Sequence, residues 1–284
     1  MTFKHYQTFF RSELASFYDA MEIDSFFYLI LEKLHQLKRI DLALNPSLQL
    51  AIADEKKWQL ILADLKEQRP IQYILGETSF YGLPFTVNEH TLIPRPETEE
   101  LVAWILADLQ SATSPLKVLD IGTGTGCIPI SLKKNNELLQ VDALDVSEEA
   151  LLVAQANAVQ NHVMITFLNQ NILEITAFSK SYDVIVSNPP YVRYSEKEAM
   201  AKNVLDFEPS LALFVFDENP LIFYEKIAAL AWKNLTPNGF LYFEINQYLG
   251  QAMLDLLSNQ GFQSVELRKD VYGNDRMIKA IKPK

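Results

Sequence analysis

The sequence has a single cysteine and fewer basic than acidic residues. Cys127 is the only cysteine among 284 residues, which excludes an intramolecular disulfide framework and a metal site built from several cysteines. The 36 acidic residues outnumber the 25 basic ones, the formal net charge is −11, and no dense Lys/Arg cluster occurs. Because duplex nucleic acids are bound largely through basic side chains on phosphates, a nucleic acid partner is disfavoured. A protein or small-molecule partner is favoured.

Long apolar runs are also missing. No stretch approaches the roughly 18–20 apolar residues that span a bilayer. The first residues show no charged segment followed by an apolar one, so no secretory signal is expected. Hydrophobic residues make up 49% of the chain and charged residues 21%, which is ordinary for a globular protein. We therefore expect a cytoplasmic protein with no membrane partner, working as a monomer.

Residues 1–75 are predicted to form a small helical domain that recognises a partner. Their apolar side chains recur at spacings of three, four and seven, as on one face of a helix. Asn45-Pro46 is interpreted as a helix start, because asparagine caps helices and proline fits their first position. Residues 76–96 are rich in proline and glycine, and Thr78–Val87 predicts a β-hairpin that links two domains.

Residues 97–284 form the second predicted domain. Strand and helix signals alternate there, which is typical of an α/β protein with a doubly wound parallel sheet. Helices are expected around residues 97–110, after the first and second strands, and around 220–234 and 248–259. The strands are expected near 117–121, 141–145, 163–167, 182–186, 239–245, 263–269 and 275–282.

A glycine-rich turn, Gly122-Thr123-Gly124-Thr125-Gly126, follows the first of these strands. Glycines let a backbone approach a ligand closely, and Asp145, at the end of the second strand, can accept hydrogen bonds from ribose hydroxyls. The spacing departs from the Gly-x-Gly-x-x-Gly dinucleotide fingerprint, and the preceding Asp120 suits a cation better than a pyrophosphate. These features favour S-adenosylmethionine, which has a ribose, a sulfonium and an ammonium but no phosphate. A tight structural turn is the alternative.

The fourth strand ends in the loop Ser187-Asn188-Pro189-Pro190-Tyr191. Two prolines remove two backbone donors and fix two φ angles, so the loop is stiff. It exposes acceptors, namely the side-chain oxygen of Asn188 and the carbonyls of Asn188 and Pro189, beside the ring of Tyr191. Such a site suits a planar group that carries an NH2, either a carboxamide or a base amine. A rigid turn with a buried tyrosine is the alternative.

Together these stretches resemble the protein-(glutamine-N5) methyltransferases that modify peptide chain release factors, the PrmC/HemK family, along nearly the whole chain. The matching stretches are Arg69–Gly76, Leu92–Glu99, Asp120–Gly126, Ala143–Ser147, Ser187–Tyr191, Phe207–Leu213 and Asp270–Arg276. The resemblance implies a Rossmann-like methyltransferase sheet of seven strands, the last one antiparallel, in a catalytic domain over 97–284. It also implies that the helical domain docks a release factor.

The resemblance assigns roles to individual residues. It implies that Asn188 and Pro189 accept both N–H protons of the glutamine amide in a Gly-Gly-Gln segment, that Tyr191 packs on the amide, and that Pro190 belongs to the same substrate-binding loop. The product would be S-adenosylhomocysteine, and no metal is expected. Where the family usually has an aspartate near the adenine, this chain has Asn171 followed by Ile172. The implied donor-binding residues are Asp120, Gly122, Thr123, Gly124, Thr125, Gly126, Asp145, Asn171, Ile172 and Asn188.

Three other functions remain as alternatives. A glutamine methyltransferase that acts on a ribosomal protein would share both motifs and differ in the N-terminal domain. A nucleic-acid adenine-N6 methyltransferase would need a basic groove and aromatic side chains for base flipping. A nicotinamide-dependent oxidoreductase would need the missing dinucleotide fingerprint and would leave the loop at Asn188 unexplained.

Overall fold

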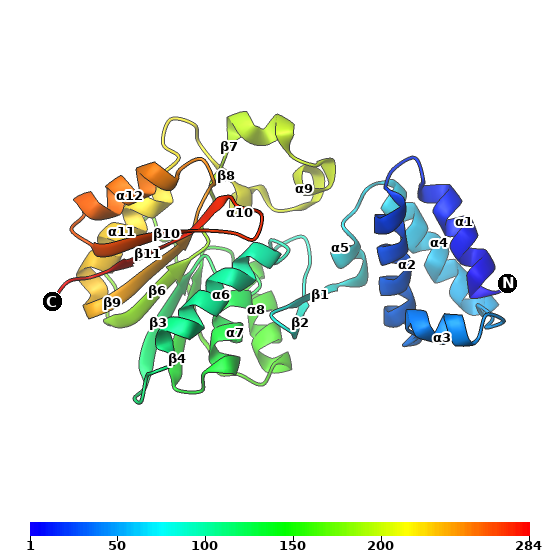
Figure 1. Ribbon diagram of the computed structural model, residues 1–284, viewed down its shortest axis with the longest axis horizontal. Helices are drawn as coiled ribbons and strands as arrows, with labels where there is room; N and C mark the ends of the chain where they lie inside the picture. Colours follow the sequence, from blue (N-terminus) through cyan, green and yellow to red (C-terminus); the bar gives the residue numbers. More distant parts are fainter. The chain divides into compact units, whose positions relative to one another are not determined.

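The computed structural model describes residues 1–284, which divide into two compact units. Residues 1–76 and 201–207 make up the first unit, and residues 77–200 and 208–284 make up the second (Figure 1). No helix is both long and apolar enough to cross a membrane. The helices of the first unit are α1 (Phe3–Leu14), α2 (Ala20–His35), α3 (Arg39–Leu44), α4 (Ile52–Lys66), α5 (Ile71–Leu75) and α9 (Lys202–Phe207).

The first unit is built around Trp58 of α4, which is fully buried. The rings of Tyr6 and Phe10, both from α1, meet the Trp58 ring edge-on, with centroids 5.2 and 5.9 Å away. The indole N–H donates to Nε2 of His35 at 3.0 Å, so the polar edge of the tryptophan is satisfied inside the core. The predicted helical N-terminal domain is confirmed.

The predicted helix start at Asn45-Pro46 is wrong. Helix α3 ends at Leu44, and α4 begins only at Ile52. Pro46 instead lies in a turn that the Leu48 N–H closes onto the Asn45 carbonyl. The chain then runs beside the N-terminus, where the Leu50 N–H donates to the carbonyl of Met1. This pairing buries Leu50 in the core, and tertiary packing therefore overrides the local capping signal.

The second unit contains a seven-stranded sheet in the order β10-β11-β9-β6-β3-β4-β5. The strands are β3 (Leu116–Ile121), β4 (Leu139–Asp145), β5 (Thr166–Asn169), β6 (Tyr182–Ser187), β9 (Leu235–Glu244), β10 (Gln263–Lys269) and β11 (Asp275–Ile281). All pairs are parallel except those of β11, which is antiparallel to both β9 and β10. The predicted sheet and its antiparallel last strand are confirmed.

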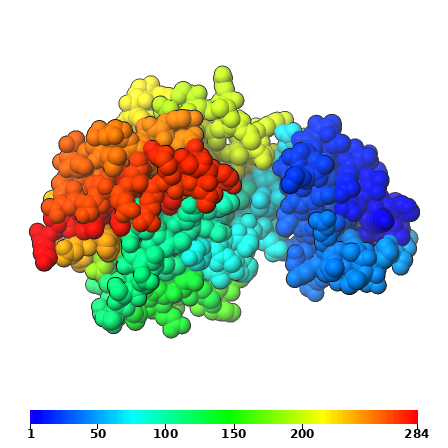
Figure 2. Space-filling model, viewed as in Figure 1, coloured from blue at the N-terminus to red at the C-terminus, as the bar shows by residue number.

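Helices cover both faces of this sheet (Figure 1). They are α6 (Pro96–Leu109), α7 (Cys127–Asn135) and α8 (Glu148–Gln160) on one face, and α11 (Ile222–Asn234) and α12 (Gly250–Asn259) on the other. Side chains alternate along the strands, so Val118 and Val184 pack under α6 and α7, whereas Leu119 and Ile185 face α11 and α12. In Figure 2, α12, β10 and β11 (orange to red) form one continuous surface of the unit.

The predicted hairpin consists of β1 (Glu77–Phe80) and β2 (Leu83–Thr86), and it groups with the second unit. Asn157, a fully buried residue of α8, holds it in place. The Asn157 side chain accepts from the Thr86 N–H at 2.7 Å and donates to the carbonyls of Thr86 and Thr125, each at 3.0 Å. One amide therefore joins the hairpin to the glycine-rich turn.

A short substructure that the sequence did not indicate lies between β6 and α11. Its elements are β7 (Val192–Arg193), the 3-10 helix η1 (Tyr194–Ala199), α10 (Ser210–Leu213) and β8 (Phe214–Val215). Strands β7 and β8 pair in parallel. Because each is only two residues long, neither has the apolar periodicity by which a strand is found in a sequence.

Replacing Gly126 by alanine is expected to lower the free energy of unfolding by about 2–5 kcal/mol. The residue has φ of +78°, which costs an L residue about 1–2 kcal/mol. An added Cβ would also lie 2.9 Å from the Ile130 side chain and 3.2 Å from Ala154, and such overpacking costs about 1–3 kcal/mol. Urea unfolding measures the loss. Gly124→Ala is the control, because its φ is +53° but no atom lies within 4 Å; equal losses would contradict the packing argument.

Candidate active site

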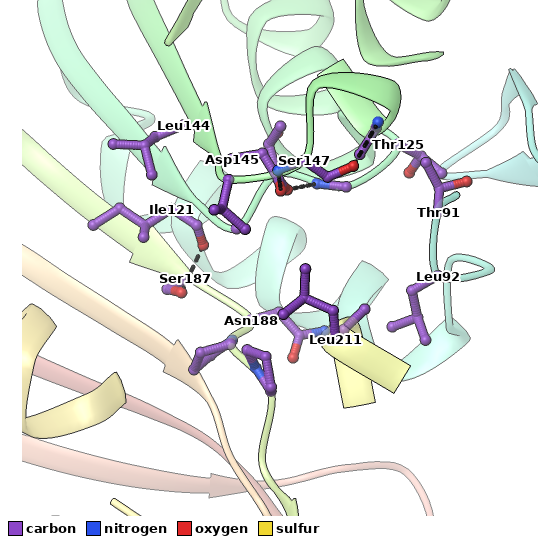
Figure 3. Close-up of a pocket in the computed structure, with 18 of the residues that line it drawn as sticks. Thr91, Leu92, Ile121, Thr125, Leu144, Asp145, Ser147, Ser187, Asn188 and Leu211 are labelled. Carbon is purple, nitrogen blue, oxygen red and sulfur yellow. Dashed lines mark hydrogen bonds between the residues drawn. The ribbon is translucent and has the colours of Figure 1, made fainter. Parts of the chain in front are cut away.

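A cavity of about 350 Å³ lies at the carboxyl ends of β3, β4 and β6. Strand β3 is followed by β4 on one side, and its neighbour β6 is followed in the sheet by β9 on the other side. The cavity therefore lies at the switch point of the sheet, the position at which such sheets bind ligands. Asp145 and Asn188 lie on either side of it, with Ile121 and Ser187 toward the strand ends and Leu211 near the mouth (Figure 3). The predicted site residues in its lining are Gly122, Thr123, Gly124, Thr125, Asp145, Asn171, Ile172, Asn188, Pro189 and Pro190.

The glycine-rich turn is held by Asp145 at the end of β4. One carboxylate oxygen accepts from the Gly124 N–H at 2.8 Å, and the other accepts from the Ser147 N–H at 3.0 Å. The φ values of Gly122 and Gly124 are +75° and +53°, so both positions need glycine. Burial raises the pKa of Asp145, although its backbone hydrogen bonds oppose that change. Each oxygen keeps a further lone pair for a ligand hydroxyl.

The Asn188 loop is fixed to the adjacent strand. The buried Ser187 hydroxyl donates to the carbonyl of Ile121 at 2.7 Å, which ties the end of β6 to the end of β3. Asn188 is half-buried, and its Nδ2 lies 3.4 Å from the hydroxyl oxygen of Thr98. The side-chain oxygen of Asn188 has no partner within the protein. The loop therefore keeps an acceptor available at the cavity.

Two polar residues next to this loop, Thr98 and Glu244, were missed by the sequence analysis, and Thr98 also lines the cavity. Thr98 of α6 donates its hydroxyl to Glu244 at 2.6 Å, and Tyr191 donates its hydroxyl to the other oxygen of Glu244 at 3.2 Å. Glu244 is 1% exposed at the end of β9, and burial raises its pKa. A glutamate ending an otherwise apolar strand, at the edge where ligands bind, was the available signal. Tyr191 itself is not among the cavity-lining residues.

Asp120 and Gly126 also lie outside the cavity lining. Gly126 packs between α7 and α8, as its close neighbours Ile130 and Ala154 show. Asp120 is 1% exposed in β3, and neither carboxyl oxygen has a hydrogen-bond partner. The buried Thr123 hydroxyl beside the cavity is also unpartnered. Orphaned acceptors of this kind fit a ligand that brings a cation and hydrogen-bond donors.

Replacing Asp120 by asparagine is expected to remove a pH dependence of stability. Burial, with a smaller effect of Asp145, raises the Asp120 pKa from 3.8 to about 7. The native state therefore binds this proton more tightly than the unfolded state, and the free energy of unfolding falls as pH rises from about 4 to about 7, by up to about 4 kcal/mol.

Urea unfolding of the protein without added ligand, across this pH range, measures the effect. In Asp120→Asn, the free energy of unfolding should not show this fall as pH rises. The difference in unfolding free energy between the variant and the unaltered protein should therefore change with pH. Parallel curves would show that the Asp120 carboxyl titrates normally.

Asn171 and Ile172, which were predicted to contact the adenine, follow β5 and line the cavity. The Asn171 side chain is already engaged, since its oxygen accepts from the Leu173 N–H at 3.0 Å and its nitrogen donates to Glu174 at 2.9 Å. Ile172 is buried and lines the cavity.

Burial raises the pKa of the Cys127 thiol to about 12, so this cysteine stays protonated at the start of α7.

Glu208, which the sequence analysis did not single out, links two segments that line the cavity. Its carboxylate accepts from Arg95 at 2.6 Å and from the Ile93 N–H at 3.2 Å. The side chain is only 2% exposed, so this ion pair is largely shielded from water on one side. It joins two lining segments, 92–95 and 209–212, and so gives Arg95 a structural partner.

The sheet order, the antiparallel β11 and a cavity at the β3–β6 switch point define a Rossmann-like methyltransferase. A solved methyltransferase from Pyrococcus furiosus shares the fold, with a TM-score of 0.53, 17% identity, and coverage of 81% of this chain and 100% of that one. Residues 102–207 match the family model of the methyltransferase small domain, and residues 8–76 match that of the PrmC N-terminal domain.

Whole-chain relatives identify the family. The release factor glutamine methyltransferase of Flavobacterium psychrophilum is 58% identical over 98% of this chain and 99% of its own. That of Bacteroides thetaiotaomicron is 42% identical over 96% of this chain and 97% of its own. The chain belongs to the family of release factor glutamine methyltransferases.

Proposed function

We propose that this protein transfers a methyl group from S-adenosylmethionine to the side-chain nitrogen of the glutamine in the Gly-Gly-Gln segment of peptide chain release factors. The observation that carries the proposal is the placement of Asn188 and Pro189 in one wall of a cavity whose opposite wall holds the glycine-rich turn and Asp145. The relative from Flavobacterium psychrophilum, which is 58% identical, is a release factor glutamine methyltransferase, and this supports the choice of substrate.

The Asn188 loop would orient the acceptor amide. A carboxamide nitrogen is a weak nucleophile, because its lone pair is delocalised into the carbonyl. The Asn188 side-chain oxygen and the Pro189 carbonyl accept its two N–H groups and so turn the nitrogen lone pair toward the methyl donor. A new N–C bond forms as the S–C bond breaks, and the methylated amide then releases one proton to water. Tyr191, anchored on Glu244, backs the loop on its buried side.

The remaining cavity residues would bind the donor, whose sulfonium supplies an electrophilic methyl group. Asp145 accepts from the ribose hydroxyls with the lone pairs that its backbone hydrogen bonds leave free. Gly122, Thr123, Gly124 and Thr125 let the backbone approach the donor, and the negative charge of Asp120, buried just before this turn, attracts the donor's cationic groups. Asn171 and Ile172 flank the adenine. No group of three or more His, Cys, Asp and Glu side chains is placed to hold a metal ion.

The helical unit would recognise the protein substrate. We propose that residues 1–75 dock the release factor, that residues 76–96 connect them to the catalytic part at 97–284, and that one copy of the chain suffices. Because release factors act in translation, the reaction would take place in the cytoplasm. The formal net charge of −11 disfavours direct nucleic acid binding.

The experiment that tests the function offers methyl-labelled S-adenosylmethionine with three acceptors in parallel. These are a purified release factor, the same factor with its Gly-Gly-Gln glutamine replaced by alanine, and a mixture of ribosomal protein and DNA. Label on the intact factor alone supports the proposal. Label on ribosomal protein or DNA instead would refute the substrate while leaving the methyltransferase fold in place.

A further inference from the structure

Asn188 is joined to the buried carboxylate of Glu244 by a chain of two hydrogen bonds that runs through Thr98. The Thr98 oxygen is 2.6 Å from Glu244 and 3.4 Å from Nδ2 of Asn188. Thr98 is 2% exposed and Glu244 1% exposed, so the bond between them is shielded from water, whereas Asn188 is half-buried at the cavity. The three side chains come from α6, β9 and the loop after β6, and the fold brings them together from distant parts of the sequence.

The direction of each of these two hydrogen bonds follows from the protons that the three side chains can supply. Both oxygens of Glu244 accept from hydroxyl donors, Thr98 on one and Tyr191 on the other, and these bonds, together with the charge of Arg276, favour the ionised carboxylate against the effect of burial. A threonine hydroxyl has one proton, and here that proton goes to Glu244. The Thr98 oxygen is then left with lone pairs alone, so only a donor can face it from the other side.

That requirement decides which way the Asn188 amide points. With Nδ2 toward Thr98, the amide donates, and its oxygen is free to face the cavity. The flipped amide would set two acceptors against each other inside the protein, which costs the full penalty of an unmet buried hydrogen bond. An asparagine without such a neighbour has no comparable reason to prefer one orientation.

We propose that Thr98 and Glu244 are positioning residues, which hold the Asn188 amide with its oxygen toward the substrate and thereby select glutamine over glutamate. This inference rests on the proposed function, because it assigns Asn188 the task of accepting from the substrate amide. A glutamate side chain offers only acceptors, so it meets the fixed Asn188 oxygen unfavourably. The reaction thus gains both orientation and discrimination from residues that do not touch the reacting nitrogen.

The test compares four proteins, namely the unaltered chain, Thr98→Val, Thr98→Ser and Glu244→Gln. Valine keeps the shape of threonine but removes the hydroxyl, and serine restores it. Thr98→Val should lower kcat about tenfold or more, the equivalent of one lost hydrogen bond in a buried site. Thr98→Ser should stay within about twofold of the unaltered protein. Because valine and serine preserve most of the shape of threonine, binding of S-adenosylhomocysteine should change less than kcat in every variant.

The preference for glutamine over glutamate is a second measurement, and a merely structural role of Thr98 and Glu244 would not change it. The dissociation constant is measured for the release factor and for its Gln→Glu variant in the Gly-Gly-Gln segment. The preference for glutamine should shrink in Thr98→Val and Glu244→Gln and persist in Thr98→Ser. An unchanged preference, or equal damage from valine and serine, would overturn the proposal.

A measurement on the protein without substrate separates this proposal from the proposed function. The Asn188 side-chain NH2 signals, assigned by their loss in Asn188→Ala, should shift in Thr98→Val and stay in place in Thr98→Ser. If the release factor is not methylated but these signals respond as expected, the substrate is wrong and the orienting contact stands. If methylation occurs and the signals do not respond, the orienting role of Thr98 is refuted.

Discussion

Replacing Asn188 by alanine is expected to lower the rate of methyl transfer to the release factor by about 10²–10³-fold, the range seen when one positioned hydrogen-bonding group is lost from an active site. The alanine variant keeps the Pro189 carbonyl but loses the side-chain acceptor that orients the amide. Single-turnover labelling with saturating donor measures the effect, since it reports the chemical step without product release.

Although the resemblance implies that Asn188 is also a donor-binding residue, the donor site should lose less than the chemical step does. Asn188 makes no hydrogen bond to the glycine-rich turn or to Asp145, so the affinity for S-adenosylhomocysteine should change little. Urea unfolding should show a modest loss, because the contact with Thr98 is long, at 3.4 Å, and Asn188 is half-buried. Full activity of Asn188→Ala would remove the basis of the proposed mechanism.

Replacing Asp145 by alanine is expected to weaken binding of S-adenosylhomocysteine about 100-fold. Hydrogen bonds to a charged group contribute about 1.5–3 kcal/mol each, and the carboxylate is proposed to hold the ribose. The variant also removes the acceptor for the Gly124 and Ser147 N–H groups, so the turn loses its anchor. Titration calorimetry measures the affinity directly.

Asp142→Asn is the matched control. Asp142 lies three residues earlier on β4 and is 7% exposed, but it is not among the cavity-lining residues and accepts from Lys180 and Tyr182. Its replacement should lower stability without changing the affinity for S-adenosylhomocysteine. If both variants bound equally well, the ribose contact of Asp145 would be wrong.

The alternating sheet was predictable because its signals are local. Strands β3 and β6 each contain a short apolar run followed by a turn, and Ser147 caps α8 by accepting from the Ala150 N–H as its residue type indicates. Asn45-Pro46 carries an equally local signal and misled, since its true environment depends on pairing with the first residues of the chain. The two-residue strands β7 and β8 carry no signal at all.

Functional residues at the ends of strands were predictable from the sequence. Functional residues whose role depends on tertiary contacts were not. Gly122 and Asn188 come just after predicted strands and Asp145 ends one, so the topology alone brings them to one edge. Thr98 lies in the first turn of a helix, and nothing near it in the sequence indicates that it faces Glu244. Glu208 is likewise a charged residue in a loop until Arg95, more than a hundred positions away, is placed beside it.

Strand β11 has a consequence for how the chain matures during synthesis. It lies between β9 and β10, and Met277 of β11 stands opposite Glu244 of β9. Every residue that lines the cavity precedes it in the sequence. Until residues 275–281 have left the ribosome, β9 has a bare edge and β10 has no strand to pair with. A nascent chain therefore contains every cavity-lining residue before β9 is paired on both edges. Strand β9 carries Glu244, which contacts Asn188 through Thr98.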